Sequence, residues 1–139
     1  MKRDLGDGYE LDDDPARLDR EAVYRYLSGE SYWAKGRARD VQDALIEGAA
    51  RVVGLYLVGA QVGFTRTLSD GHAQSYLADV YVLEEHRGRG LGVELVRFSV
   101  DEGPLAETKW LLHTSDAHGL YRKFGFTEPD ERAMERWRR

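Results

Sequence analysis

Residues 81–92 read YVLEEHRGRGLG, and they say more about the architecture of this chain than any other stretch. An apolar strand that ends at Leu83 leads into an amphipathic helix. Between them, Gly88, Gly90 and Gly92 occupy alternate positions. Glycine tolerates a positive φ angle and a close approach to its backbone, and the first turn of a helix carries unpaired N–H groups. The stretch therefore predicts a cradle for an anion, and a pyrophosphate fits it.

Two common nucleotide-binding loops fit this stretch poorly. The P-loop ends in Gly-Lys-Ser/Thr, which reaches terminal phosphates and magnesium, and that ending is missing here. The dinucleotide fingerprint opens an early βαβ unit and is followed by an acidic ribose partner, whereas this loop lies past the middle of the chain. ATP and dinucleotides are therefore disfavoured as ligands.

A second motif lies downstream, where residues 117–126 read AHGLYRKFGF. This segment resembles the A-x-x-L-Y-x-x-x-G-F motif of the GNAT N-acetyltransferase superfamily. Residues 87–92 resemble the R/Q-x-x-G-x-G/A loop of the same superfamily, with Arg87, Gly90 and Gly92 on its defining positions. Two motifs in the right order are much stronger evidence than one short motif. The resemblance extends roughly over residues 51–126 and identifies the chain as similar to a small, single-domain bacterial member.

The resemblance implies acetyl-CoA (coenzyme A) as the cofactor. In the superfamily, the strand before the loop splays from its neighbour at a β-bulge and frees N–H groups for the acyl carbonyl. Thr114 stands where many relatives carry Asn, so one cofactor-side hydrogen bond is expected to differ. The cofactor-binding residues implied in this sequence are Tyr81, Val82, Leu83, Arg87, Gly88, Arg89, Gly90, Leu91, Gly92, Thr114, Ala117, Gly119, Tyr121 and Lys123.

Tyr121 occupies the position of the superfamily's acid, which protonates the departing thiolate. A phenol suits this role because its unperturbed pKa of about 10 keeps it protonated near neutral pH. A tyrosine at helical spacing is also compatible with simple core packing. Gly119 favours the functional interpretation: a glycine inside a short helix costs about 1 kcal/mol relative to alanine, so its presence suggests that a ligand or backbone passes close by.

The general base stays open at the level of sequence. Asp79, Glu84, His72 and His113 are candidates, and a chain of water molecules would serve as well. Lone histidines and strand carboxylates are more often structural or solvated than catalytic.

The expected reaction is acetyl transfer from acetyl-CoA to a primary amine of a small molecule, by direct attack on the thioester. The resemblance places the acceptor site at the loop of residues 31–37 and at nearby strand residues. The candidate residues are Tyr32, Trp33, Arg66 and Asp79, with Asp70 as a further wall residue. The two aromatic side chains could instead pack against the end of the sheet. A protein N-terminal or lysine acetyltransferase, or a CoA-binding regulatory module with weak catalysis, are the alternatives.

Composition narrows the other function classes. A chain of 139 residues with 42% hydrophobic content is expected to form one domain over residues 1–139. The absence of cysteine excludes disulfides, a cysteine nucleophile and thiolate metal sites, and the four histidines lack zinc-ligand spacing, so no metal is expected. No G-x-S-x-G elbow of a serine hydrolase is present. The net charge of −5 disfavours nucleic acid as a partner. The basic residues Arg87, Arg89, Arg122 and Lys123 nevertheless gather at the two motifs.

The sequence also carries indications of location. No apolar run approaches the ~20 residues of a membrane span, and the first residues lack the apolar core of a signal peptide. A cytoplasmic protein without a membrane partner, monomeric or homodimeric, is therefore expected. Sixteen arginines against four lysines fit a GC-rich bacterial source.

Periodicity predicts the order ααβββαβαβ. Helices are expected over 17–28 and 41–46, the second with Asp40 as its N-cap, followed by a hairpin of 52–58 and 61–67 about Gly59. Strand 75–83, helix 90–102, strand 109–113, helix 117–124 ending at Gly125, and a last strand 133–137 complete the chain, and residues 9–11 form a short edge strand. The expected class is α/β (α+β), a GNAT fold with a mixed, mostly antiparallel twisted sheet and helices on both faces.

Overall fold

The architecture centres on one sheet of six strands in the order β1-β2-β3-β4-β5-β6, in a computed structural model that describes residues 1–138. Neighbouring strands run antiparallel except for β5 and β6, which are parallel. The predicted mixed, mostly antiparallel sheet is confirmed. The strands are β1 (Lys2–Gly6), β2 (Tyr9–Asp12), β3 (Arg51–Leu57), β4 (Ala60–Ser69), β5 (Gln74–Val82) and β6 (Lys109–Leu111).

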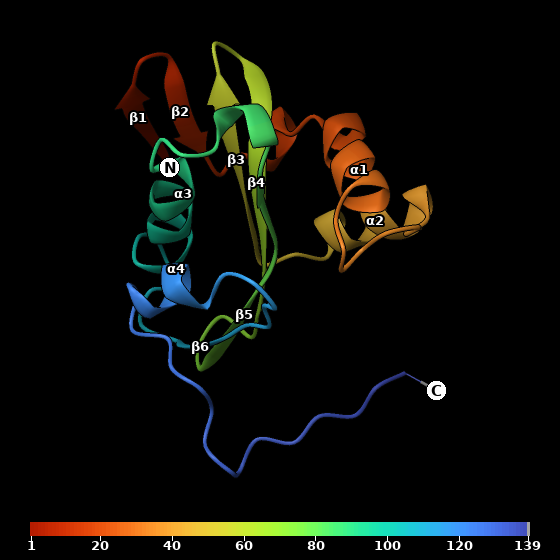
Figure 1. Ribbon diagram of the computed structural model, residues 1–139, viewed down its shortest axis with the longest axis vertical. Coiled ribbons are helices and arrows are strands. Elements are labelled where there is room, and N and C mark those ends of the chain that lie inside the picture. The colour runs from red at the N-terminus through yellow and green to blue at the C-terminus, as the bar shows by residue number, and fades with distance from the viewer. Residues whose placement is uncertain (139) are drawn as a thin grey trace.

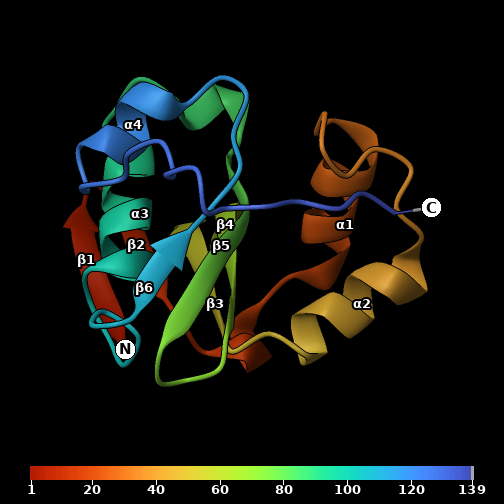
Figure 2. The same ribbon diagram turned by 90° about the horizontal axis from the view of Figure 1, so that it is seen from below.

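Helices cover both faces of the sheet, as predicted (Figure 1; Figure 2). One face carries α1 (Arg20–Gly29) and α2 (Arg39–Glu47), and the other carries α3 (Leu91–Val100) and α4 (His118–Arg122). Two short 3-10 helices, η1 (Pro15–Arg17) and η2 (Glu84–His86), precede α1 and the glycines before α3.

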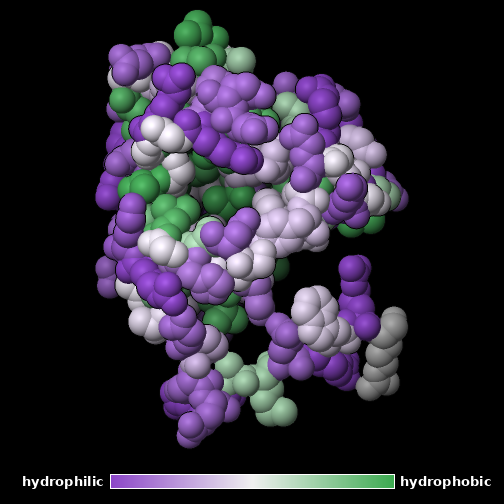
Figure 3. All heavy atoms as spheres, in the orientation of Figure 1, coloured by the Kyte–Doolittle hydropathy of each residue, from purple (hydrophilic) through white to green (hydrophobic). Residues whose placement is uncertain are grey.

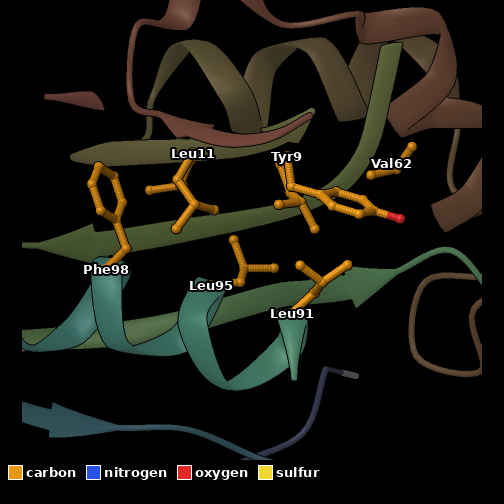
Figure 4. Packing of buried hydrophobic residues seen from close by; sticks show 8 residues of the cluster. Tyr9, Leu11, Val62, Leu91, Leu95 and Phe98 are labelled. Carbon is orange, nitrogen blue, oxygen red and sulfur yellow. The ribbon is translucent and has the colours of Figure 1, made fainter. Parts of the chain in front are cut away.

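The core under α3 follows directly from the helical spacing in the sequence. Leu91, Leu95 and Phe98 lie on one face of α3 and pack against Leu11 and Val53 of the sheet (Figure 4). Burying a large apolar side chain contributes about 1.5–3 kcal/mol, so this layer fixes α3 on the sheet. The N-terminus of α3 is thereby held at the end of β5.

The β3–β4 hairpin is also confirmed. Its turn residues Val58 and Gly59 have φ angles of 47° and 85°, the pair of positive values that a two-residue turn of type I′ requires. The hairpin places β4 next to β5, which carries the site.

The N-terminal region differs from the prediction. Residues 2–6, which are mostly charged and carry no apolar alternation, form β1 because they pair with β2 through the turn at 6–8. Strand β2 is therefore an inner strand between β1 and β3, and the expectation of an edge strand there is wrong. The first helix begins at Arg20, because the Asp19 carboxylate accepts a hydrogen bond from the Ala22 N–H at 3.0 Å and caps it.

The predicted N-cap of α2 is wrong by two residues. The helix begins at Arg39, and its N-cap Ala38 makes no side-chain hydrogen bond. The Asp40 carboxylate accepts from the Val41 N–H inside the first turn, where a negative charge still favours the helix dipole.

The predicted last strand is wrong as well. Residues 133–137 alternate in the sequence, but residues 127–138 contain neither helix nor strand. Met134 and Trp137 are 98% and 79% exposed. Alternation produces a strand only where a neighbour offers its hydrogen-bonding edge, and this segment runs away from β6 (Figure 1). Two side-chain contacts tie it back, from Arg122 to Glu128 at 2.5 Å and from His113 to Glu135 at 2.7 Å.

Among the described residues, none of the helices has the length and apolar character needed to cross a membrane.

Candidate active site

The site begins at a β-bulge in β5. Phe64 of β4 faces Tyr81, whereas Arg66 faces Ala78, so two residues of β5 lie opposite one residue of β4. The extra residue is Asp79, whose φ angle of +55° is uncommon outside glycine but tolerated by aspartate. The sequence placed the splay near residues 81–83, and the bulge lies just before them.

Beyond the bulge, β5 has an open edge. Its parallel partner β6 pairs only with residues 74–76. The Leu83 N–H donates to the Val62 carbonyl on β4 at 2.8 Å, whereas the Val82 carbonyl accepts from Arg87 Nε at 2.8 Å on the other side. The N–H and C=O of one strand residue point to the same side, so the Val82 N–H faces the open edge. A backbone donor is therefore available at the position that the superfamily uses.

The glycine loop, residues 87–92, opens directly onto the N-terminus of α3. Gly88 and Gly90 have φ angles of 80° and 77°. A Cβ atom added at Gly88, Gly90 or Gly92 would meet no atom within 4 Å, so the space over the loop is free. Gly90 caps α3 without any side-chain hydrogen bond, which leaves the first-turn N–H groups available. The loop has the features of an anion cradle.

Arg87 acts as a brace of this loop. Besides the bond to Val82, its Nη2 donates to the Tyr26 hydroxyl at 3.0 Å. The side chain thus joins the glycine loop to β5 and α1, and it lies beside the predicted cofactor side. Arg89 and Lys123 are exposed.

Tyr121 lies at the other side of the open edge, on α4. Its side chain is 8% exposed and packs with Leu77, Val96 and Val100, and its ring meets Phe126 edge-on. Burial raises the pKa of Tyr121 to about 12, with smaller contributions from Tyr32 and Asp116. None of residues 1–138 forms a hydrogen bond with its hydroxyl. The ring serves the core, and the protonated hydroxyl is free to donate.

The start of α4 is organised around the same point. The Thr114 hydroxyl accepts from the Ala117 N–H at 3.1 Å and orders the turn into the helix. A Cβ atom at Gly119 would meet nothing within 4 Å, so that side of α4 is open. Between η2 and α4, the space-filling view shows a hollow with apolar atoms at its floor (Figure 3).

A side-chain network around the buried carboxylate of Asp79 lies on the α1/α2 face of the sheet. The Asp79 carboxylate accepts from Trp33 Nε1 at 2.9 Å, from Arg37 Nη1 at 3.0 Å and from Arg66 Nε at 2.8 Å. We call Trp33, Arg37, Arg66 and Asp79 the acceptor cluster. Three of the four predicted acceptor residues are members, and they come from the α1–α2 loop, β4 and β5. The sequence did not single out Arg37, because nothing in a loop arginine indicates a buried partner 42 residues away.

The cluster determines the charge of Asp79. Burial disfavours the ionised carboxylate, but the charge of Arg66 and the hydrogen bonds from Arg37 and Arg66 outweigh it, so the pKa of Asp79 is lowered. A carboxylate that is held ionised by two guanidinium groups is a poor acceptor of an amine proton.

The other base and wall candidates have different partners. His113 bonds the Tyr76 hydroxyl through Nδ1 at 2.6 Å and Glu135 through Nε2, while His72 and Glu84 are exposed. Asp70 accepts from three backbone N–H groups of the β4–β5 turn, which lower its pKa to about 2. Asp70 is therefore a turn residue.

Tyr32 links the two sides of the site. Its hydroxyl accepts from the Ser115 N–H at 3.0 Å, just ahead of α4, and its ring meets Trp33 edge-on. Tyr32 and Trp33 stay 57% and 39% exposed, so they are not buried against the sheet. No cluster of three metal-binding side chains occurs within residues 1–138.

Comparison with known proteins agrees with this geometry. A family model described as an acetyltransferase (GNAT) domain matches residues 48–128, more than half of the chain. A candidate acetyltransferase of Gibberella zeae is 28% identical, over 86% of this chain and 80% of its own length.

Solved structures extend the comparison. The crystal structure of a candidate GNAT-family acetyltransferase from Xanthomonas campestris pv. campestris is 36% identical, with a TM-score of 0.88 over 93% of this chain and 92% of that one. A candidate acetyltransferase from Deinococcus radiodurans R1 shares the fold at 22% identity, with a TM-score of 0.70 over 99% of this chain and 94% of that one.

Proposed function

This chain belongs to the GNAT acetyltransferase family, and on that premise we propose that it transfers an acetyl group from acetyl-CoA to a primary amine of a small molecule. The observation that carries the proposal is the open edge of β5 at Val82, next to the uncapped glycine turn before α3. The thioester carbonyl of acetyl-CoA would need a hydrogen-bond donor, and its pyrophosphate would need an anion cradle. The open edge and the glycine turn would supply the two side by side.

The glycine loop would hold the pyrophosphate. Its positive φ angles turn backbone N–H groups outward, and a side chain at Gly88 or Gly90 would occupy the space that the ligand needs. The uncapped first turn of α3 adds further donors and the positive end of the helix dipole. Arg87 would keep this loop fixed to β5.

The Val82 N–H would hold the acyl carbonyl. A backbone donor on a rigid strand is aimed before the reaction starts, so it stabilises the oxyanion of the tetrahedral intermediate without reorganising. The amine nitrogen attacks the carbonyl carbon, the C–N bond forms, and the C–S bond then breaks. The amine loses one proton and the departing thiolate gains one, so the products are an amide and a free thiol.

Tyr121 would donate the proton to the thiolate. Its raised pKa keeps the hydroxyl protonated throughout the neutral range. Apolar surroundings disfavour the charged phenolate and a charged thiolate beside it alike, so the two shifts offset one another. Tyr121 is reprotonated by solvent.

The amine proton would leave through water. Asp79 has a lowered pKa and three donors on its carboxylate, so it fits a role in positioning rather than in proton removal. An amine that enters in its neutral form needs no strong base.

Two other functions fit the same cradle. A CoA-binding regulatory module would use the glycine loop without turnover, and a protein acetyltransferase would present a lysine or an N-terminal amine to the same edge. The free hydroxyl of Tyr121 favours turnover over binding alone.

The test combines binding and turnover. Acetyl-CoA and CoA should raise the melting temperature and ATP should not, since a ligand at a hundredfold excess over Kd adds about 2.7 kcal/mol of stability. Release of free thiol should then be measured over a panel of small amines and lysine peptides. A melting shift without thiol release for any amine would support the regulatory module, and no shift with acetyl-CoA would refute the proposal.

A further inference from the structure

Arg66 is a buried arginine on the α1/α2 face of the sheet. Phe64, two residues earlier on β4, packs in the cluster under α1, whereas Thr65 bonds Ser99 of α3 on the opposite face. Side chains alternate along a strand, so Arg66 shares the face of Phe64. Its side chain is 9% exposed.

The hydrogen bonds of Arg66 are incomplete. Its Nε donates to Asp79 at 2.8 Å, but no acceptor for Nη1 or Nη2 is found within residues 1–138. Neither nitrogen belongs to the fully buried unpaired atoms, so both reach solvent-accessible space. A guanidinium group presents Nη1 and Nη2 as a planar fork that matches the two oxygens of a carboxylate. This fork is free.

Arg51, the other buried arginine of residues 1–138, and the half-buried Arg37 both use terminal nitrogens in hydrogen bonds. Arg51 donates from Nη1 to the carbonyls of Phe98, Ser99 and Glu102 and from Nε to Asp13. The terminal nitrogens of Arg37 donate to Gln42 and Asp79. Buried polar groups are normally paired, so the unpaired fork of Arg66 points to a ligand group that completes it.

The position of Arg66 suits an acceptor substrate. Gly63, three residues from Arg66 along β4, faces Val82, so the level of Val82 is about 10 Å from the Arg66 Cα atom. Asp79, at the bulge, binds the guanidinium group through one carboxylate oxygen and Trp33 Nε1 through the other. A molecule of a few bonds can therefore reach both Arg66 and the proposed acyl site.

The charges around Arg66 favour an anion. Two guanidinium groups, Arg37 and Arg66, face the single carboxylate of Asp79, which leaves the acceptor cluster with one excess positive charge. The nearby carboxylate of Glu135 is bound by His113, whose other nitrogen bonds Tyr76.

We propose that the fork of Arg66 binds an anionic oxygen group of the acceptor, so that the substrate is an amine which also carries a carboxylate or a similar oxyanion. This inference rests on the proposed function, because it concerns the acceptor of the same reaction. Trp33 and Asp79 hold the guanidinium group in place, and Arg66 sets the specificity.

The experiment compares substrates that differ only in the anion. Thiol release is measured with β-alanine and β-alaninamide, with taurine and O-phosphoethanolamine as sulfonate and phosphate arms, and with glycine and glycinamide as a shorter pair. The wild type and Arg66→Gln are compared by the ratio of kcat/KM for the acid to that for the amide. The basicity of each amine is the same for both proteins, so it cancels from this comparison.

The wild type should have a higher kcat/KM for the acid than for the amide. Arg66→Gln should lower this ratio about 10- to 100-fold, as expected for the loss of a charge-assisted pair. Arg66→Lys, which keeps the charge without the fork, should fall between them. Arg20→Gln is the control, because it removes the same charge at the far end of α1 and should keep the wild-type ratio.

Melting shifts with the same compounds in the presence of CoA give a readout that does not need turnover. A larger shift with the acid than with the amide, lost in Arg66→Gln, supports the inference. Equal ratios and equal shifts for the two proteins overturn it, whether or not any amine reacts. The proposed function fails separately, by the absence of a melting shift with acetyl-CoA alone.

Discussion

The two sides of the site are built from different groups, one mainly from backbone and the other from side chains. The proposed cofactor side, formed by β5 beyond the bulge and the glycine loop, offers mainly backbone N–H groups and open space above glycines. The proposed acceptor side is a network of side chains around the buried carboxylate of Asp79. Backbone groups are the same in every chain and serve a shared ligand, whereas a side-chain network can differ from one relative to the next. The comparison indicates that specificity resides in the side chains of the acceptor side.

Tyr121, on α4 beside the proposed cofactor side, is the residue for which we propose a role in side-chain chemistry. Tyr121→Phe keeps the ring that packs on Leu77 and removes the donor, so kcat should fall about 10²- to 10⁴-fold. The KM for acetyl-CoA and the melting temperature should change little. Steady-state kinetics on the folded variant test this, and an unchanged kcat would assign Tyr121 to packing alone.

Asp79 tests the acceptor side. Asp79→Asn keeps a residue type that accepts the positive φ angle but leaves Arg37 and Arg66 buried without a counter-charge. Removing one partner of a buried charged network costs about 3–5 kcal/mol. Denaturant unfolding measures the loss, with Asp70→Asn in the exposed turn as the control. A loss below about 1 kcal/mol would contradict the view that this network organises the site.

A substitution of Gly90 tests whether the cofactor side needs a backbone that no side chain covers. Gly90→Val forces a β-branched residue into a φ angle of 77° and places a side chain over the loop, so the stabilisation of about 2.7 kcal/mol by a hundredfold excess of acetyl-CoA should disappear. Gly71→Val introduces the same strain in the β4–β5 turn, where φ is 81°, and should keep the shift. Retention of the shift in Gly90→Val would refute the cradle.

Arg87 belongs to the glycine loop, but it acts through its side chain, which binds the backbone of β5 and the hydroxyl of Tyr26. Arg87→Ala loses the bonds to Val82 and Tyr26, and the KM for acetyl-CoA should rise about tenfold while kcat changes less. A fall in kcat with an unchanged KM would show instead that Arg87 sets the geometry of the acyl site.

The smallest expected effect is the pH dependence of the acceptor cluster. The folded pKa of Asp79 is lowered, so its contribution to stability is present above the unfolded value near 3.8 and is lost as the pH falls through the folded value. The stability difference between wild type and Asp79→Asn should stay constant from pH 7 to about pH 5. Below about pH 4 it should shrink by at most about 1.4 kcal/mol per pH unit. A difference that grows with acid would mean that Asp79 is protonated in the folded protein.

Much of the sheet and of the cofactor side was predictable from local patterns. The β3–β4 hairpin followed from a two-residue turn at Gly59, and α3 followed from the spacing of Leu91, Leu95 and Phe98. Both depend on contacts within a few residues or on a single periodicity. Strand β1 was missed because its residues alternate in exposure only once β2 lies beside them.

The errors at the C-terminal end have the same cause. Residues 133–137 have the alternation of a strand, but a strand needs the edge of another strand, and sequence alternation alone does not say whether one is within reach. Asp40 has the residue type of an N-cap, but the N-cap of α2 is Ala38, two residues earlier. The path of the loop before α2 sets where the helix begins, and it overrides the local preference of Asp40 for the N-cap position.

Local sequence was sufficient for the family, the co-substrate expected from it and the position of the glycine loop, because φ angles, helix termini and strand periods are properties of neighbouring residues. The acceptor cluster was settled only by tertiary structure. Trp33 and Arg66 lie 46 and 13 residues from Asp79 along the chain, and the loop before α2 and the bulge in β5 bring them together. Which charges are buried together, and which fork is left free, depends on packing across the sheet, and no local pattern encodes that.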